Sequence, residues 1–280
     1  MPSNSPASVI VSSYNDLPIL EPSLAALSVQ SFRDFELIIA DDGSSQDYAP
    51  VLAAWAAKFA HGIQHVTHEK KGYRRPRILN RAIHVSRFDR VIIMDMDCLP
   101  HRHFVRNHLA YLRPGTAITG RRVDISRDAL PAAQQILERG LEFSLPVLLW
   151  MWLQGKAKRV EHGFVSPIFY ESTHAALLGC NFSLCKSDLQ MLNGLDEEIP
   201  GWGGDDTELD LRLHFMGAKI RNLRNKVIEY HLTHPHREAC VEQRDAIIER
   251  TRTEKSIRSR LGLSQIQESD FSCTRFGSAE

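Results

Sequence analysis

The stretch that most constrains this chain is residues 91–98, where four apolar residues run directly into two carboxylates. A short apolar run of this kind predicts a buried strand. Because side chains alternate along a strand, Asp95 and Asp97 are expected on one face and Met96 on the other. Two carboxylates on one face repel each other unless a cation lies between them. At the carboxyl end of a strand, where open α/β sheets bind ligands, we expect a divalent metal that brings a substrate phosphate with it. Two solvated acids are the alternative.

Strands and helices are expected to alternate through the first hundred residues. Apolar runs bounded by turn residues predict strands, and apolar spacings of three and four predict helices. The expected strands are residues 8–13, 35–40, 62–68 and 91–94, and the expected helices are residues 17–29, 48–59 and 76–85. This alternation predicts an α/β, Rossmann-like fold with a mostly parallel sheet and helices on both faces.

The rest of the chain is less regular. We expect strands at residues 117–123, 177–185 and 226–231, helices at 130–152, 207–216 and from 238 onward, and a loop at 155–173. The last ten residues are expected to be disordered. The chain is accordingly divided into residues 1–115, residues 116–237 as the second half of the same domain, and residues 238–280 as a helix and tail.

Composition excludes some partners. The 280 residues include 34 basic and 34 acidic side chains, so no overall charge favours nucleic acid, and phosphate binding must be local. The five cysteines contain no C-x-x-C pair, which is typical of reduced thiols in a cytoplasmic protein. The first residues lack a basic segment followed by an apolar run, so no signal peptide is expected.

The longest apolar stretch is residues 143–153, followed by Lys156, Lys158 and Arg159. It is shorter than the roughly 20 residues that a membrane-spanning helix needs. A core helix, a lid and an interfacial segment with a basic flank all fit the pattern. The last of these would bring residues 143–159 to the inner face of the membrane as a peripheral contact.

Polar residues also follow the carboxyl ends of the first two expected strands. Ser12, Tyr14 and Asn15 follow the first strand, and Asp41 and Asp42 follow the second. Each cluster alone is explained equally well by an ordinary turn. The carboxyl ends of parallel strands share one edge, however, so three polar clusters at that edge together predict a ligand site.

A basic loop precedes the third helix. Residues 70–77 contain Arg74 and Arg77, which could receive a phosphate at the helix N-terminus, and Asn80 lies one turn further on. A solvated basic loop is the alternative.

A second informative segment is residues 201–210, where Trp202 lies among glycines, Gly203 included, before Asp205 and Asp206. Acids in a first helical turn are explained by the helix dipole alone. The large aromatic among glycines instead indicates a loop that contacts substrate. A carboxylate held there, near a metal and phosphates, can act as a general base on a hydroxyl.

Three histidines follow the last strand, at His231, His234 and His236. His231 could complete a metal site beside Asp97, whereas His234 and His236 are explained as surface or core histidines. No cysteine accompanies them, so a closed structural zinc site is not indicated.

The order of these motifs resembles a known family. Ser12-x-Tyr14-Asn15, then residues 41–44 (Asp-Asp-Gly-Ser), then Asp95-Met96-Asp97 is similar to the family 2 glycosyltransferases, which have the GT-A fold. Residues 179–183 and 201–206 resemble the carboxyl-terminal half that chondroitin-polymerase-like and β-galactosyltransferase-like enzymes share.

This resemblance implies a role for each matching residue. Residues 1–115 would bind a nucleotide sugar and residues 116–237 would bind the acceptor. The donor would be held by Ser12, Tyr14, Asn15, Asp41, Asp42, Arg74, Arg77, Asn80, Asp95 and Met96. The acceptor would contact Trp202, Gly203 and Asp205. Mn²⁺ or Mg²⁺ would be held by Asp97, Asp95 and His231, and Asp206 would be the general base, assisted by Asp205. The family usually has Glu-Asp where this chain has Asp205-Asp206, so either carboxylate could be the base.

We therefore expect an inverting, metal-dependent glycosyltransferase that moves a sugar from a nucleotide-diphosphate donor, uridine being favoured by the resemblance, to a hydroxyl of a glycan or lipid-linked acceptor. A sugar-phosphate nucleotidyltransferase is one alternative, but it would carry a Gly-rich basic loop directly after the first strand. A non-catalytic nucleotide-sugar- or carbohydrate-binding module is another, and the acids retained at the expected site argue against it.

Overall fold

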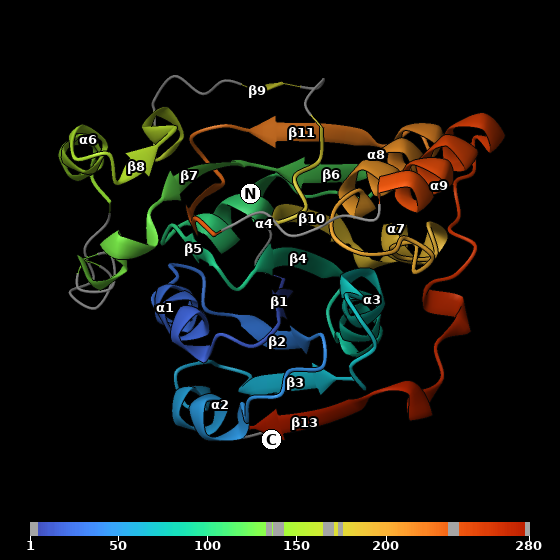
Figure 1. Cartoon of the computed structure of the whole chain (residues 1–280), viewed down its shortest axis with the longest axis horizontal. Helices are drawn as coiled ribbons and strands as arrows, with labels where there is room; N and C mark the ends of the chain where they lie inside the picture. Colours follow the sequence, from blue (N-terminus) through green and yellow to red (C-terminus); the bar gives the residue numbers. More distant parts are fainter. Residues whose placement is uncertain are drawn as a thin grey trace.

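The computed structural model describes residues 5–132, 136, 143–164, 171–172, 176–234 and 241–277. Within these residues the strands form a nine-stranded sheet in the order β13-β3-β2-β1-β4-β10-β6-β11-β9 and a four-stranded sheet in the order β5-β12-β7-β8 (Figure 1). The predicted α/β architecture is confirmed.

The N-terminal half of the large sheet is parallel. Its strands are β1 (Ala7–Ser13), β2 (Phe35–Asp41), β3 (Ile63–Thr67) and β4 (Arg90–Asp95). Ser12 pairs with Ala40 on one side and Asp95 on the other, so the carboxyl ends of these strands are aligned. The other half is mixed, with β6 (Thr116–Thr119), β9 (Glu171–Ser172), β10 (Asn181–Cys185) and β11 (Lys219–Leu223).

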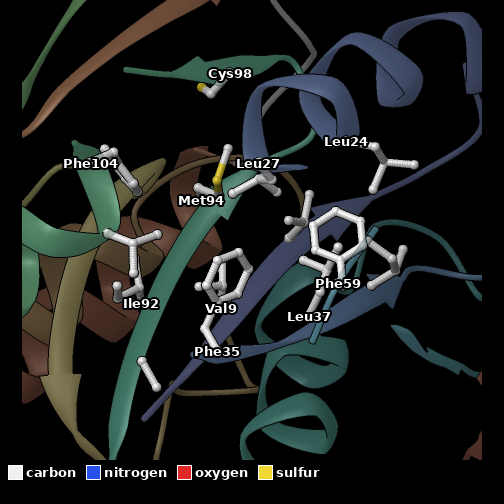
Figure 2. Close-up of a cluster of buried hydrophobic side chains, with 14 of the residues drawn as sticks. Val9, Leu24, Leu27, Phe35, Leu37, Phe59, Ile92, Met94, Cys98 and Phe104 are labelled. Atoms are coloured by element: carbon white, nitrogen blue, oxygen red, sulfur yellow. The ribbon is translucent and has the colours of Figure 1, made fainter. Parts of the chain in front are cut away.

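Helices cover both faces of this sheet. Apolar residues of α1 (Leu17–Ser28), α2 (Ala49–Ala56) and α4 (Phe104–Tyr111) pack on the face that carries Val9 and Leu37. Figure 2 shows Leu24 and Leu27 of α1 and Phe104 of α4 in this core. On the other face, α3 (Arg75–Val85), α7 (Lys186–Met191) and α8 (Asp205–Phe215) pack on Ile10 and Ile38. The alternation of buried side chains along β1 and β2 therefore supplies two cores.

The small sheet lies beside the end of β4. It contains β5 (Cys98–Pro100), β7 (Arg121–Ile125), β8 (Ala157–Lys158) and β12 (Ile228–Leu232). A third core forms between this sheet and α6 (Leu145–Leu153). Within the described ranges, no helix has both the length and the apolar character needed to cross a bilayer.

Several expectations differ from the structure. The loop expected at residues 155–173 contains the short strands β8 and β9. The last ten residues, expected to be disordered, include β13 (Ser272–Phe276), which pairs antiparallel with β3. The single strand expected at residues 117–123 is two strands, β6 and β7, which belong to different sheets. Of the helix expected at 130–152, residues 133–135 and 137–142 lie outside the described part. Helix α9 (Val241–Glu254) agrees with the expected charged helix.

Candidate active site

A pocket opens at the carboxyl ends of β1, β2 and β4. Its lining residues come from these strand ends, from the start of α3 and from the loops before α8 and after β12. They are Ser12, Ser13, Tyr14, Asp42, Tyr73, Arg75, Ile78, Asp95, Met96, Asp97, Trp202 and His234. The structure thus brings together residues from each of the sequence motifs at one edge of the sheet.

Arg75, the first residue of α3, lies at the centre of the site. Its guanidinium contacts Asp95 Oδ1 at 2.8 Å through Nη2 and Asp205 Oδ2 at 2.6 Å through Nη1. Nη2 also donates to the carbonyl of Gly179 at 2.7 Å. Burial opposes the charge of Arg75, but Asp95 and Asp205 raise its pKa well above the ordinary value. A buried cation therefore links the strand end that carries Asp95 to the loop that precedes α8.

Asp42 is held by three neighbours. His68 Nε2 lies 2.8 Å from Oδ1, while Lys70 Nζ and the backbone N–H of Arg74 donate to Oδ2 at 3.1 and 3.0 Å. The Lys70 ammonium also lies 3.6 Å from the centre of the Tyr14 ring. These contacts fix an acid and an aromatic ring at one side of the pocket, where a flat base can be bound by stacking and hydrogen bonding.

Asp41 and Asn15 instead hold the loops around the pocket. Asp41 accepts a hydrogen bond from the backbone N–H of Ser44 and lies 3.1 Å from His65 Nε2. The Asn15 side chain accepts from the backbone N–H of Ser45 at 2.9 Å. Both side chains hold the loop after β2 in place and do not line the pocket. They would therefore affect a ligand only through the shape of that loop.

Asp97, His231 and His234 form a candidate metal site at the other side of the pocket. Their ligand atoms all lie within 4.8 Å of one another, and Asp97 Oδ2 is 3.7 Å from His231 Nε2 and 3.3 Å from His234 Nε2. Burial opposes the charge of Asp97, but the hydrogen bond with His234 and the charges of both histidines lower its pKa. Asp124 Oδ1 lies 3.4 Å from His231 Nδ1, where it can orient the ring.

This donor set fits a first-row divalent ion. One carboxylate oxygen and two imidazole nitrogens suit Mn²⁺ better than Mg²⁺, which prefers oxygen ligands alone. Asp95, predicted as a ligand, is not part of this three-residue group, and its Oδ1 accepts hydrogen bonds from Arg75 and Ser12. His234, which the sequence analysis explained as a surface or core histidine, is the third member of the group.

Asp205 and Asp206 differ sharply in their surroundings. Asp205 is buried against Arg75, so its charge is already balanced. Asp206 accepts hydrogen bonds from the backbone N–H groups of Gly179 and Thr207, at 3.1 and 2.8 Å. Burial first, and then the charge of Asp205, raise the pKa of Asp206. Asp206 is the better proton acceptor of the two, because its pKa is raised and the direct ion pair with Arg75 is made by Asp205.

The loop that carries Trp202 is held against α9. Gly203 and Gly204 both have positive φ, and a Cβ at Gly204 would lie 2.5 Å from Arg244 of α9. Glycine is therefore required where the loop enters α8. Trp202 lines the pocket at the end of this loop, next to the two carboxylates that begin the helix.

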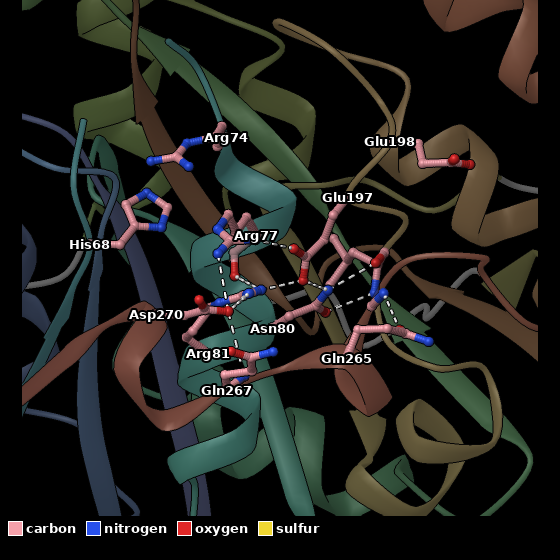
Figure 3. A network of polar contacts seen from close by, with 12 residues as sticks. His68, Arg74, Arg77, Asn80, Arg81, Glu197, Glu198, Gln265, Gln267 and Asp270 are labelled. Atoms are coloured by element: carbon pink, nitrogen blue, oxygen red, sulfur yellow. Dashed lines mark hydrogen bonds and ion pairs between the residues drawn. The ribbon is translucent and has the colours of Figure 1, made fainter. Parts of the chain in front are cut away.

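Besides Asp41 and Asn15, three more predicted donor residues do not line the pocket. Figure 3 shows Arg77 and Asn80 directed toward Glu197, with hydrogen bonds of 3.1 and 2.9 Å. Asn80 is fully buried and also bonds the backbone of Leu195, so it cannot reach a ligand in the pocket. The side chain of Arg74 bonds the carbonyl of Glu69, and only its backbone N–H meets Asp42.

Sequence reasoning missed Arg75, although a signal for it was present. The buried face of α3 contains Ile78, Leu79 and Ala82, and Arg75 lies on the same face one turn earlier. Arg77 and Arg81 share a different face. The helical phase, rather than the number of charges in the basic loop, therefore distinguishes the arginine that lines the pocket.

The fold is of the GT-A type, and acids and a candidate metal site lie at the ends of its strands. The model of the family described as "Glycosyl transferase family 2" matches residues 8–177, and the model described as "N-terminal domain of galactosyltransferase" matches residues 161–237. The chain belongs to glycosyl transferase family 2, as its motifs had predicted.

A chondroitin synthase from Escherichia coli is 25% identical over 250 residues, which are 82% of this chain and 35% of that protein. The chain spans about a quarter to a third of the length of the synthases it matches. Among solved structures, the mannosyltransferase PcManGT from Pyrobaculum calidifontis, in complex with GDP-Man and Mn²⁺, has a TM-score of 0.53 and 22% identity over 83% of this chain and 58% of that one. GalNAc-T7 with UDP, GalNAc and Mn²⁺ has a TM-score of 0.56 and 12% identity over 82% of this chain and 43% of that one.

Proposed function

We propose that this glycosyltransferase is metal-dependent and inverting, and that it transfers a sugar from a nucleotide-diphosphate donor, with UDP-sugars preferred, to a hydroxyl of a glycan or lipid-linked acceptor. The observation that carries the proposal is a candidate metal site, Asp97 with His231 and His234, together with a carboxylate of raised pKa, Asp206. Asp206 begins α8 beside Asp205, which pairs with Arg75 of the pocket.

The donor half of the pocket would bind the nucleotide. Asp42 and Tyr14 offer an acid and an aromatic ring for the base, and Ser12, Asp95 and Met96 lie toward the ribose and diphosphate. Asp97, His231 and His234 would hold Mn²⁺, which supplies charge to stabilise the departing diphosphate. Arg75 keeps Asp95 and Asp205 in place and adds positive charge near the same phosphates.

The acceptor half would place the attacking hydroxyl. Trp202 offers a flat surface for a sugar ring, which is a common way to bind carbohydrate. Asp206 would take the hydroxyl proton as the oxygen attacks the anomeric carbon from the face opposite the diphosphate. Because one displacement suffices, no covalent enzyme intermediate is needed and the anomeric configuration inverts.

The first experiment is a donor screen. The purified chain would be incubated with Mn²⁺ and a panel of UDP-, GDP- and dTDP-sugars, and release of nucleoside diphosphate recorded with and without EDTA. We expect EDTA-sensitive release from a UDP-sugar. Absence of binding to every donor in the panel would contradict the proposed donor class.

The base assignment is tested by Asp206→Asn. We expect turnover to fall by about a thousandfold or more, because the hydroxyl loses its proton acceptor, while donor affinity stays near wild type. Donor binding would be measured by calorimetry with Mn²⁺ present, and the product configuration by NMR. Near-wild-type turnover in this variant would assign the base elsewhere.

The location of the chain is also part of the proposal. The described cysteines, Cys98, Cys180, Cys185 and Cys273, are free thiols, as expected in the cytoplasm. A peripheral contact with the inner face of the membrane through residues 143–159 would bring a lipid-linked acceptor within reach.

A further inference from the structure

Helix α6 (Leu145–Leu153) is apolar on every side. Its sequence, LPVLLWMWL, contains no polar side chain. A helix of this kind is normally buried all round, either in a large core or in a membrane. In this structure only Leu148 and Met151 are buried, and they pack with Val123 and Tyr230 of the small sheet. Val147 is partly buried against the same core, and the remaining side chains of the helix are exposed to solvent.

The exposed part of α6 is large and continuous along the helix. Five of its side chains expose 40% or more of their surface, and they are Leu145 (40%), Leu149 (42%), Trp150 (50%), Trp152 (53%) and Leu153 (76%). We call this set the α6 patch. Contiguous apolar patches on a protein surface mark sites that bind another apolar surface.

Basic residues gather beside the patch. Lys158, the last residue of the short strand β8, and Arg159, which follows it, are both exposed. Burial first, and then the charges of Arg224 and Arg159, lower the pKa of Arg121, so these three arginines belong to one basic region. Two carboxylates accompany these cations: Glu161 is exposed, and Asp124 lies 3.5 Å from Arg159. The excess of positive charge favours an anionic partner.

We infer that the α6 patch and its basic neighbours bind the surface of a membrane that contains anionic lipids, with α6 lying flat in the interface. Tryptophan and leucine beside lysine and arginine are the side chains that favour this position. A second copy of the chain fits less well. A two-fold symmetric contact would place the patch against itself and the basic clusters near each other, where their charges repel.

This contact would orient the active site. Leu148 of α6 packs in the same core as Tyr230 and Leu232 of β12, the strand that carries His231 of the candidate metal site. The bilayer would therefore lie on the side of the small sheet, away from β13 at the far edge of the large sheet. This placement favours an acceptor that is itself anchored in the membrane, an inference that rests on the proposed function.

The test is sedimentation of the purified full chain with vesicles of phosphatidylcholine alone or mixed with phosphatidylglycerol. We expect at least about tenfold tighter binding to the anionic vesicles, weakened by salt. The variant Trp150→Gln/Trp152→Gln/Leu153→Gln should lose at least about tenfold in vesicle affinity, since it removes buried apolar area. Lys158→Gln/Arg159→Gln should lose about tenfold on anionic vesicles only.

A matched control is Met191→Gln in α7, which removes an equally exposed apolar side chain (52%) outside the patch and should bind as wild type. Thermal unfolding would show that each variant is folded. Two results would overturn the inference: no vesicle binding by the wild type, or equal binding by the triple variant. A wild-type dimer that the triple variant converts to a monomer, without vesicle binding, would assign the patch to a second copy. Vesicle binding without donor turnover would leave this inference standing and contradict only the proposed function.

Discussion

At the scale of single residues, Arg75 joins the two halves of the site. Its guanidinium contacts Asp95 at the end of β4 and Asp205 at the start of α8. Removing it would leave the buried carboxylate of Asp205 and the partly exposed carboxylate of Asp95 without their cation, which is costly for Asp205. The same change would also remove a positive charge that offsets the repulsion between Asp205 and Asp206.

We expect Arg75→Met to lower kcat/KM by about a hundredfold, a loss of about 2.7 kcal/mol of transition-state stabilisation. Arg74→Met is the matched control, because Arg74 is the adjacent residue but its side chain bonds the Glu69 carbonyl. That variant should change kcat/KM by less than about fivefold. Equal losses in the two variants would contradict the role given to Arg75 and favour a general effect of positive charge.

The pH dependence of catalysis tests how Asp205 acts on Asp206. Burial and the charge of Asp205 raise the pKa of Asp206, so the rate should fall, as pH decreases, at a pH above the ordinary range of an aspartate. Asp205→Asn removes the repulsion and should lower the pKa of Asp206. The acidic limb of kcat/KM, measured at saturating Mn²⁺, should then move to lower pH. Movement to higher pH would show that Asp205 stabilises the ionised base.

The residue types of the site were predictable, but their contacts were less so. Asp42, Asp95, Asp97 and Trp202 all line the pocket, as strand-end motifs and the glycine loop had predicted. The partners of each acid depend on which way a side chain leaves a helix or a loop. Arg75 points into the pocket, whereas Arg77 points toward Glu197.

At the scale of elements, α3 is anchored on the side opposite the pocket by a buried polar network. Glu197 binds both Arg77 and Arg81, and Asp270 binds the same two arginines from the C-terminal segment (Figure 3). The side chains of Glu197 and Arg81 are 2% and 1% exposed. Because charges buried this deeply need their partners, the network fixes where α3 begins and therefore where Arg75 lies.

We expect Glu197→Gln to lower the free energy of unfolding by about 3 kcal/mol, since Arg81 would keep a buried charge with one partner fewer. The measurement is equilibrium unfolding in urea. Glu198→Gln is the matched control, because Glu198 is 35% exposed and pairs with Arg250 at the surface. It should cost less than about 1 kcal/mol. An equal loss of unfolding free energy in both variants would mean that the buried network stabilises the fold no more than a surface ion pair does.

The elements of the first hundred residues were predictable because each parallel strand is a short apolar run. Later elements depend on contacts that a local pattern does not contain. Gly120 separates β6 from β7, and a Cβ there would lie 2.0 Å from the carbonyl of Val227. The glycine lets the chain pass from one sheet to the other. The side chains of β13 are mostly exposed, so no apolar alternation marks it as a strand.

At the scale of the whole molecule, the candidate metal site joins the two sheets. Asp97 lies in the turn between β4 of the large sheet and β5 of the small one, and His231 belongs to β12. A bound ion would therefore stabilise the folded chain as well as the donor complex. Binding to the folded state alone raises stability by RT ln(1 + [L]/Kd).

We expect Mn²⁺ at about a hundred times its Kd to raise Tm by roughly 5 °C without any donor present. His234→Gln should abolish most of this rise, because it removes one of the three ligands. His214→Gln is the control, since His214 is an exposed residue of α8. A rise that is the same in His234→Gln as in wild type would place the ion elsewhere.

The position of β13 has a consequence for how the chain is made. Cys273 contacts Gln64, a residue 209 positions earlier in the sequence. During synthesis on the ribosome, β3 is complete long before the strand that covers its edge has been translated. Throughout that interval the growing chain presents an open strand edge, the kind of surface to which other chains add. Slow translation or early termination of this chain would therefore extend the period in which chaperone binding or self-association competes with folding.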